Sequence, residues 1–319
     1  MITDIPTKDD FYAMADHIVN EAWEKVAGMA YEHRDIGVSN RFFSESEYFT
    51  EKNFIDIEDN YWKFERPKLI TALTLILQSV EFRIKGLIVD ISPYLLITNA
   101  TRNPPKADDQ GNISFSEFHT LDAQDLIKVH DTFSGNKLSN EFTDWFRTMR
   151  MLRNRFMHTV DKSTDITPEL IFTSVAFAHK HLNKESPHWI WHRYQYRTEH
   201  SSTGIDYESR YGEGFSSAVW EMLPTHYEFA SAIFSCSKES ARKYFGYIKN
   251  EPGDANPKES FYCQKCLSVM EKKEYFDSKN IDSALKTVQY NHKSNSYICA
   301  FCCDKKNTKP RDWEDENEE

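Results

Sequence analysis

Apolar and polar residues alternate with helical periodicity through much of the first 185 positions. From Glu141 to His158 the apolar side chains recur every three or four residues, which predicts one amphipathic helix. Those apolar positions are Phe142, Trp145, Phe146, Met149, Leu152 and Phe156. A second segment, from Pro67 to about Ile91, is apolar almost all round, as is typical of a buried central helix.

The polar residues of this central helix form a single stripe. Thr74, Gln78, Glu81 and Lys85 are separated by four, three and four positions, so they share one helical face. A polar stripe on a buried helix normally faces a cleft or another subunit. We therefore expect Glu81 to lie in a cleft and to contact a substrate there.

Helix start signals predict two further helices. Asp9 and Asp10 can cap a first helix that runs to about Tyr31. The face of this helix that we expect to be buried holds Phe11, Met14, Ile18, Ala22 and Val26. Thr167, followed by proline at the first helical position, begins another helix that runs to about Leu182.

Two Cys-x-x-Cys pairs near the C-terminus carry the strongest chemical signal. Cys263 with Cys266 and Cys299 with Cys302 can each turn through a tight knuckle, and four thiolates suit one tetrahedral Zn²⁺ ion. Such a closed site has no open coordination position, so we expect a structural zinc in a small zinc ribbon. Cys303 is a rival for Cys302, and the sequence leaves that choice open. His292 is a weaker substitute ligand.

The region between the first helices and the cysteines is harder to interpret. Residues 188–197 alternate aromatic and polar side chains, which favours a half-buried strand or an extended arm over a base-stacking surface. Residues 215–250 look helical, with a break expected near Pro224. Residues 250–257 carry the clearest linker signals of the chain.

These patterns predict a mainly α protein with a small metal-bound module. With a short helix over about 121–132, residues 1–185 are expected to form a helical bundle. A helical or extended segment follows over 186–250, then the Cys₄ zinc ribbon over 251–311 and an acidic tail over 312–319. Only 10 glycines and 11 prolines in 319 residues argue against a turn-dense all-β protein.

Charge and cysteine placement indicate the setting and the partners. The net charge of −11 is uneven, because residues 256–311 hold 11 Lys and Arg against 6 Asp and Glu. The acidic remainder argues against broad, nonspecific binding of duplex nucleic acid. The chain starts without a signal-peptide pattern, and its apolar runs are too short to span a membrane. We expect a cytoplasmic protein without a membrane partner, since most of its cysteines suit a metal rather than disulfides.

The end of the amphipathic helix carries candidate chemistry for a phosphodiester. Arg153 offers a charged fork for phosphate oxygens, and His158 can transfer protons near neutral pH. On an ideal helix Asn154 lies about 40° from His158, and Arg147 and Arg150 join that face as candidate substrate-binding residues. Arg153 lies about 140° from His158, so it either needs a loosened helix or serves the cleft from another direction, such as a second protomer.

The run Leu152–His158 resembles the signature of the HEPN superfamily, which is arginine, a small polar residue, three variable residues and histidine. Arg153, Asn154 and His158 take those positions. The segment 73–88 resembles the buried second helix of the family, with Glu81 and Lys85 at its acidic and lysine positions. The resemblance covers roughly residues 8–185.

The resemblance implies a homodimeric helical bundle in which two motif helices meet and form a shared ribonuclease cleft. Many members are metal-independent endoribonucleases in toxin, antiphage or RNA-processing roles. We therefore expect RNA cleavage by attack of the 2′-OH, with Arg153, Asn154 and His158 as catalytic residues, in phage defence or as a toxin with an inhibitor or partner protein. The alternative is a non-catalytic HEPN dimer that binds protein or RNA through its zinc ribbon.

Overall fold

The computed structural model describes residues 1–43, 51–98, 100, 104–158, 165–183, 186, 188–200, 217–250, 254–270 and 286–310. Over these residues the chain is mainly helical, as predicted, with a small sheet near the C-terminus. The predicted acidic tail and part of the predicted linker, residues 251–253, lie outside this range. Within it, no helix combines the length and the apolarity needed to cross a lipid bilayer.

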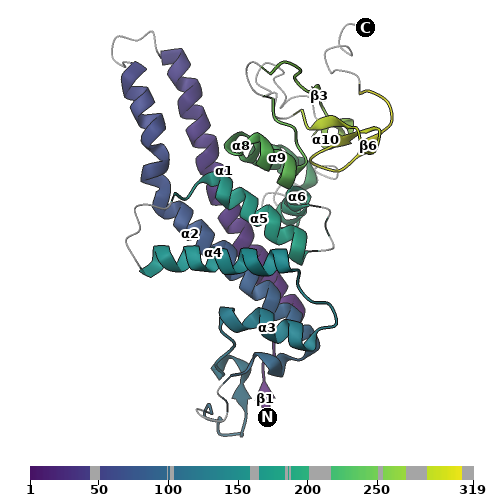
Figure 1. Cartoon of the computed structure of the whole chain (residues 1–319). Coiled ribbons are helices and arrows are strands. Elements are labelled where there is room, and N and C mark those ends of the chain that lie inside the picture. Colours follow the sequence, from purple (N-terminus) through teal and green to yellow (C-terminus); the bar gives the residue numbers. More distant parts are fainter. Residues whose placement is uncertain are drawn as a thin grey trace, which may run out of the picture. The chain divides into compact units, whose positions relative to one another are not determined.

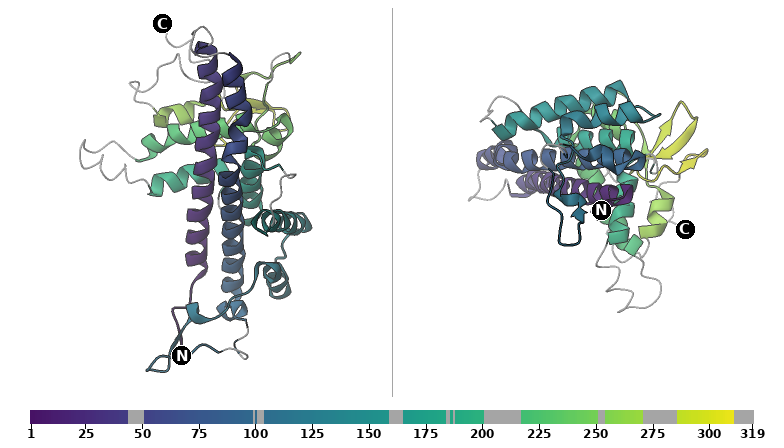
Figure 2. Two further views of the ribbon diagram at one scale, coloured as in Figure 1. Left: turned by 90° about the vertical axis from the view of Figure 1, so that its left-hand side faces the viewer. Right: turned by 90° about the horizontal axis from the view of Figure 1, so that it is seen from below.

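The chain forms two compact units, and each is built from two separate stretches of sequence. The first unit comprises Met1–Ala22 and Ile70–Asp165, and the second comprises Trp23–Leu69 and Ile166–Glu319. Two long helices, α1 (Lys8–Phe43) and α2 (Glu51–Ile91), contribute residues to both units. They lie side by side in Figures 1 and 2.

In the first unit, the opening part of α1 and the second part of α2 pack with the helix that carries the candidate chemistry. That helix is α4 (Asn140–His158), close to the predicted limits, and it packs against α2 (Figure 2). The buried side chains include Ala15, Leu73, Leu77, Ile84, Phe142 and Phe146. The smaller elements are β1 (Ile2–Thr3), η1 (Pro93–Leu96), β2 (Ile113–Ser114), η2 (Phe115–Glu117) and α3 (Ala123–Phe133).

The start of α1 differs from the sequence prediction. Thr7 caps the helix through reciprocal bonds with Asp10, since the Asp10 N–H donates to Thr7 Oγ1 at 3.2 Å and the Thr7 N–H donates to Asp10 Oδ2 at 2.8 Å. Met14, expected in the core, is 49% exposed, because the buried face runs through Ala15, Val19 and Ala22 instead.

A glycine of α2 allows this helix to approach α1 closely. A Cβ atom on Gly86 would lie 2.7 Å from Cε1 of the Tyr12 ring, which is closer than two carbon atoms can pack. The Arg83 guanidinium lies over the same ring, 4.3 Å from its centroid, and bonds to Asp16. The two helices are therefore held by one small residue, one ring and one ion pair.

Over the described residues, the second unit combines several helices, the parts of α1 and α2 between Trp23 and Leu69, and the small sheet. The helices are α5 (Pro168–Leu182), α6 (Trp189–His200), α8 (Ser217–Ser235) and α9 (Lys238–Phe245). The antiparallel sheet has the order β3 (Ser260–Phe261), β4 (Val288–Asn291), β5 (Ser296–Cys299) and β6 (Lys305–Lys306), and α10 (Gln264–Met270) follows β3. Trp23 is buried against the rings of Phe172, Trp189 and Phe245, at centroid distances of 4.8, 5.5 and 6.4 Å.

In this unit, capping residues predict where helices begin and end better than prolines do. Thr167 caps α5 as predicted, with its hydroxyl accepting from the Leu170 N–H at 3.2 Å. Pro67 and Pro224 lie inside α2 and α8, so the expected helix start and helix break at these residues are wrong. A proline removes one backbone hydrogen bond, which a well-packed helix can tolerate. The break falls instead at Ser237, whose side chain caps α9.

Residues 189–200 form helix α6, so the predicted strand or extended arm over 188–197 is wrong. The buried positions are Trp189, Ile190, Arg193 and Tyr194, which are spaced as one helical face. Arg193 hides this pattern in the sequence, because a charged residue is expected to be exposed. Its side chain is only 1% exposed.

Arg193 belongs to a partly buried network of charges. Its guanidinium donates to Glu228 at 2.8 and 2.9 Å and to Glu24 at 2.8 Å. Arg197 also bonds to Glu228, at 2.9 Å, and the Trp23 indole N–H donates to the same carboxylate at 2.9 Å. Burial alone would lower the pKa of Arg193, but its bonds to Glu228 and Glu24 raise the pKa, so the charge is kept. The network ties α1, α6 and α8 together.

We predict that Glu228→Ala lowers the free energy of unfolding by about 3 kcal/mol, because it leaves the buried Arg193 charge poorly compensated. The matched control is Glu259→Ala, which removes an ion pair to Lys309 whose side chains are 69% and 55% exposed. This control should cost less than about 1 kcal/mol. Urea unfolding followed by tryptophan fluorescence measures both, and equal losses would contradict the role of the network.

Candidate catalytic helix and candidate metal centre

Helix α4 has one buried and one exposed face, as its sequence pattern predicts. Phe142, Phe146 and Met149 are buried in the first unit. The exposed face holds Arg147, Met151, Asn154 and His158, which follow one another at intervals of four, three and four residues. Three of the predicted site residues therefore share one solvent-facing stripe.

Arg153 lies at the side of this stripe and is held by two other predicted site residues. Its Nη1 atom donates to Glu81 Oε1 on α2 at 3.2 Å. Its Nε and Nη2 atoms donate to Asn154 Oδ1 at 3.2 and 3.1 Å. The Arg153 and Glu81 side chains are each about one-fifth exposed. The polar stripe of α2 thus faces α4 at Glu81.

His158 is the last residue of α4 and is exposed. Its ring forms no hydrogen bond with the part of the chain that the structure describes. The helix stays regular through His158, so it does not loosen to bring Arg153 and His158 to one side. Within one chain the two candidate catalytic groups therefore point in different directions.

The two candidate substrate-binding arginines differ in their surroundings. Arg147 is exposed and pairs with Asp144 of the same helix at 3.4 Å. The guanidinium of Arg150 lies over the Phe146 ring, 5.7 Å from its centroid, and its Nε atom is buried without a hydrogen-bond partner among the described residues. Arg147 remains available to an anionic ligand, whereas part of Arg150 is covered by the helix itself.

The second unit brings Cys263, Cys266, Cys299 and Cys302 together as predicted. Their sulfur atoms all lie within 4.8 Å of one another, with 3.6 Å between Cys263 and Cys302 and 4.0 Å between Cys266 and Cys299. A disulfide would need about 2.05 Å. Four thiolates at about 2.3 Å from a tetrahedral zinc lie about 3.8 Å apart, so the four sulfurs fit a single metal ion.

Backbone and hydroxyl donors surround one of these sulfurs. The Phe301 and Cys302 N–H groups each donate to Cys299 Sγ at 3.4 Å, and Thr287 Oγ1 lies 3.1 Å from it. Strand β5 positions Cys299 opposite Val288 of β4. Burial raises the pKa of Cys299, so ionisation of this thiol needs a cation beside it. A bound metal would supply that charge.

The structure also decides the choice between neighbouring cysteines. Cys303 is exposed and has a left-handed backbone, with φ of 60°, while its N–H donates to the Cys299 carbonyl at 3.0 Å. This turn directs Cys302 toward the other three sulfurs and excludes Cys303. His292 is not part of the cluster.

The sequence did not identify the aromatic wall that supports the second knuckle. Phe301 lies between the two ligands Cys299 and Cys302 and is fully buried. Its ring stacks on the His226 ring, with 3.8 Å between the ring centroids and an interplanar angle of 11°. Neither ring nitrogen of His226 has a hydrogen-bond partner among the described residues. Burial lowers the pKa of His226 to about 3, so the ring is neutral at pH 7. The contact joins positions 75 residues apart, for which the sequence gives no local signal.

No protein-family model, no curated protein and no solved structure matches this chain. The relation to the HEPN superfamily therefore stays a prediction from the motif and the helix order. The chemistry of the two sites has to be argued from their own residues.

We predict that Cys302→Ser lowers the metal bound per chain well below that of the unchanged protein, because one of four ligands is lost. Cys303→Ser is the matched control and should keep its metal, since this thiol lies outside the cluster. Elemental analysis of the purified full chains measures both. Loss of metal from Cys303→Ser alone would show that the ligands are assigned wrongly.

We predict that His226→Phe makes unfolding less sensitive to acid. An unfolded histidine takes up a proton below about pH 6.5, whereas burial holds the folded pKa at about 3. Between these values the unfolded state binds more protons, so the stability of the folded state falls as the pH drops. The free energy of unfolding of the variant, relative to the unchanged protein, should rise by about 1 kcal/mol between pH 7 and pH 5.5.

Urea unfolding at the two pH values gives this difference, and comparing two proteins cancels any general effect of acid on the metal centre. His292→Phe, at an exposed histidine of the same unit, should behave like the unchanged protein. If the difference in unfolding free energy between His226→Phe and the unchanged protein is the same at pH 7 and pH 5.5, burial does not hold this ring neutral.

Proposed function

We propose that this protein is a HEPN-type, metal-independent endoribonuclease that is active as a homodimer. The observation that carries the proposal is the placement of the motif residues on α4. Arg153 is fixed by Glu81 and Asn154, while Asn154 and His158 share the exposed face of the same helix. One helix thereby carries both a permanently charged guanidinium and an imidazole, although the two point in different directions within one chain.

The proposed reaction needs no group beyond these side chains and the RNA. The 2′-OH of a ribose attacks the neighbouring phosphorus, and the bond from phosphorus to the 5′-oxygen of the next nucleotide breaks. His158 takes or gives the proton, and Arg153 stabilises the negative charge that develops on the phosphoryl oxygens. The products carry a 2′,3′-cyclic phosphate and a 5′-OH. DNA lacks the 2′-OH and is not cleaved.

A dimer along α4 would resolve the separation of Arg153 and His158 within one chain. Around a two-fold axis, His158 of one protomer can approach Arg153 of its partner, because the same surface patch meets itself. The exposed face of α4 includes Met151, which is 62% exposed, and the nearby Met157 is 59% exposed. Met151 shares the face of Asn154 and His158, so a second copy packed on this face would bury it, whereas Met157 lies about 120° away around the helix.

For the second unit we propose a structural zinc. Four cysteine ligands leave no open position for a water or a substrate, which favours a structural over a catalytic metal. The strands of the sheet are only two to four residues long, so the metal would supply much of the stability of this module. The zinc module would help to select the RNA or a partner protein.

One observation favours a second candidate function, a non-catalytic dimer that acts as a scaffold. The Arg153 charge is already paired with Glu81, so this side chain has a structural role in the first unit. In this alternative α4 still provides the dimer contact, and the zinc module binds the partner.

Cleavage of RNA by the full chain separates the two functions. We predict that His158→Ala lowers the rate by about 10²–10⁴-fold, which is the usual loss when a general acid or base is removed. His119→Ala, at an exposed histidine of the same unit, is the matched control and should keep full activity. Cleavage should leave 2′,3′-cyclic phosphate ends and should continue after brief addition of EDTA.

Size-exclusion chromatography with light scattering shows whether each variant keeps the oligomeric state of the unchanged protein. Full cleavage by His158→Ala would overturn the catalytic assignment. An unchanged protein that is dimeric but cleaves no RNA would support the scaffold instead.

A further inference from the structure

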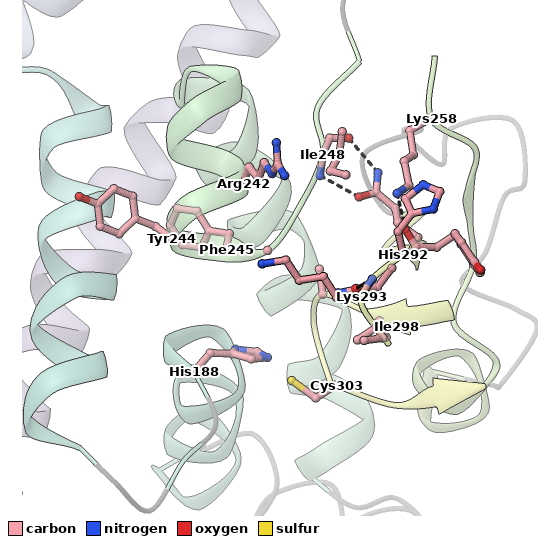
Figure 3. A pocket seen from close by; sticks show the side chains of 16 residues that line it. His188, Arg242, Tyr244, Phe245, Ile248, Lys258, His292, Lys293, Ile298 and Cys303 are labelled. Carbon is pink, nitrogen blue, oxygen red and sulfur yellow. Dashed lines mark hydrogen bonds between the residues drawn. The ribbon is translucent and has the colours of Figure 1, made fainter. Parts of the chain in front are cut away.

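A cavity of about 470 Å³ lies in the second unit, beside the candidate metal centre, whose ligand Cys299 forms part of its lining. The C-terminal part of α9 and the β4–β5 hairpin form two of its walls (Figure 3). Three of its lining residues, Arg242, Lys258 and Lys293, carry basic side chains, and no aspartate or glutamate is among the described residues that line it. Two of these residues, Lys258 and Lys293, belong to the basic segment 256–311 of an otherwise acidic chain.

The cations come from three different segments. Arg242 lies on α9, Lys258 precedes β3, and Lys293 lies in the turn of the hairpin and extends toward the end of α9 in Figure 3. Arg242 and Lys293 form no ion pair with any residue that the structure describes. The pKa of Lys258 is lowered first by burial and second by the nearby Arg242 charge. A like charge without a counter-charge disfavours the charged form of a lysine.

A buried histidine adds a hydrogen-bond donor to the same cavity. His188 Nδ1 accepts from the Trp191 N–H at 3.3 Å, so the proton of the neutral ring is on Nε2. That Nε2 atom is buried, and the Phe301 backbone lies close enough to the ring to offset part of the effect of burial. The ring is directed toward Cys303 and the cavity in Figure 3. Burial lowers the pKa of His188 to about 4, so at pH 7 it is a neutral donor.

The rest of the lining is apolar and suits a flat ring. Phe245, Ile248, Ile298 and Ala300 contribute to it. The volume lies in the range of small-ligand pockets and is larger than a phosphate ion alone needs. The cavity therefore offers both an anion-binding side and an apolar side.

We propose that this cavity binds a phosphorylated nucleotide, with the phosphate between Arg242 and Lys293 and the base against the apolar wall. The nucleotide is either free in solution or the 5′-terminal nucleotide of an RNA strand, since the recognised chemistry is the same. This function goes beyond the proposed cleavage, because every lining residue belongs to the second unit.

Calorimetric titration of the full chain with AMP, adenosine and inorganic phosphate tests the site. AMP should bind more tightly than adenosine or phosphate. The double variant Arg242→Gln with Lys293→Gln should weaken AMP binding at least tenfold, because two charge-assisted hydrogen bonds are lost. The double variant Lys305→Gln with Lys306→Gln removes the same charge from exposed residues of β6 outside the cavity, and it should weaken binding less than twofold.

A second arm identifies the source of the nucleotide. It uses the His158→Ala chain, so that RNA is not consumed and the result does not depend on cleavage. An RNA oligonucleotide with a 5′-phosphate that binds more tightly than AMP, and more tightly than the same RNA with a 5′-OH, identifies a strand end. Equal binding of AMP and the phosphorylated RNA identifies a free nucleotide.

Three results would overturn the proposal. The first is the absence of binding by both AMP and the phosphorylated RNA at millimolar concentration. The second is unchanged AMP binding by the cavity variant. The third is an equal loss of AMP affinity in the β6 control variant, because general surface charge would then explain the weaker binding. Circular dichroism and metal content verify that each variant is folded.

Discussion

The buried guanidinium of Arg193 is the constraint on which the second unit depends. A charge that is almost wholly out of water must be matched, and Glu228 and Glu24 match it from α8 and α1. Helix α8 then carries His226 and Phe229, which pack on Phe301 between two of the clustered cysteines. The same Phe229 contacts Phe245 at the wall of the cationic cavity. One ion cluster thus fixes the helix that supports both the metal centre and the cavity.

Local sequence signals predicted the parts of the structure that local physics controls. The limits of α4, the Thr167 cap of α5 and the four clustered cysteines all follow from spacing and capping chemistry. Helix α6 was missed because Arg193 is buried by carboxylates that are distant in the sequence. The start of α2 was placed too late, because Pro67 is typical of a helix start and instead lies inside the helix. For α6, tertiary contacts overrode a local rule, whereas at the start of α1 one local cap replaced another.

The candidate sites show the same division. The motif predicted Arg153, Asn154 and His158, and the polar stripe predicted Glu81; the structure joins Arg153 to Asn154 and Glu81 by hydrogen bonds but does not bring His158 to Arg153 within one chain. The sequence could not choose between Cys302 and Cys303, because that choice depends on a left-handed residue in the turn. Nor could it reveal the cationic cavity, whose three cations come from segments up to 51 positions apart that the sheet and α9 bring together.

The division of each unit between two stretches of chain has a consequence for synthesis on the ribosome. Residues 23–69 emerge about 100 positions before the segment from Ile166 onward with which they form the second unit. Before Ile166 emerges, residues 23–69 lack the rest of the second unit to pack against. The first unit, whose last residue is Asp165, can complete its core before the second unit is fully synthesised. No single proteolytic cut releases either unit whole, and two of the three boundaries between the units, at Ala22–Trp23 and Leu69–Ile70, lie inside the continuous helices α1 and α2.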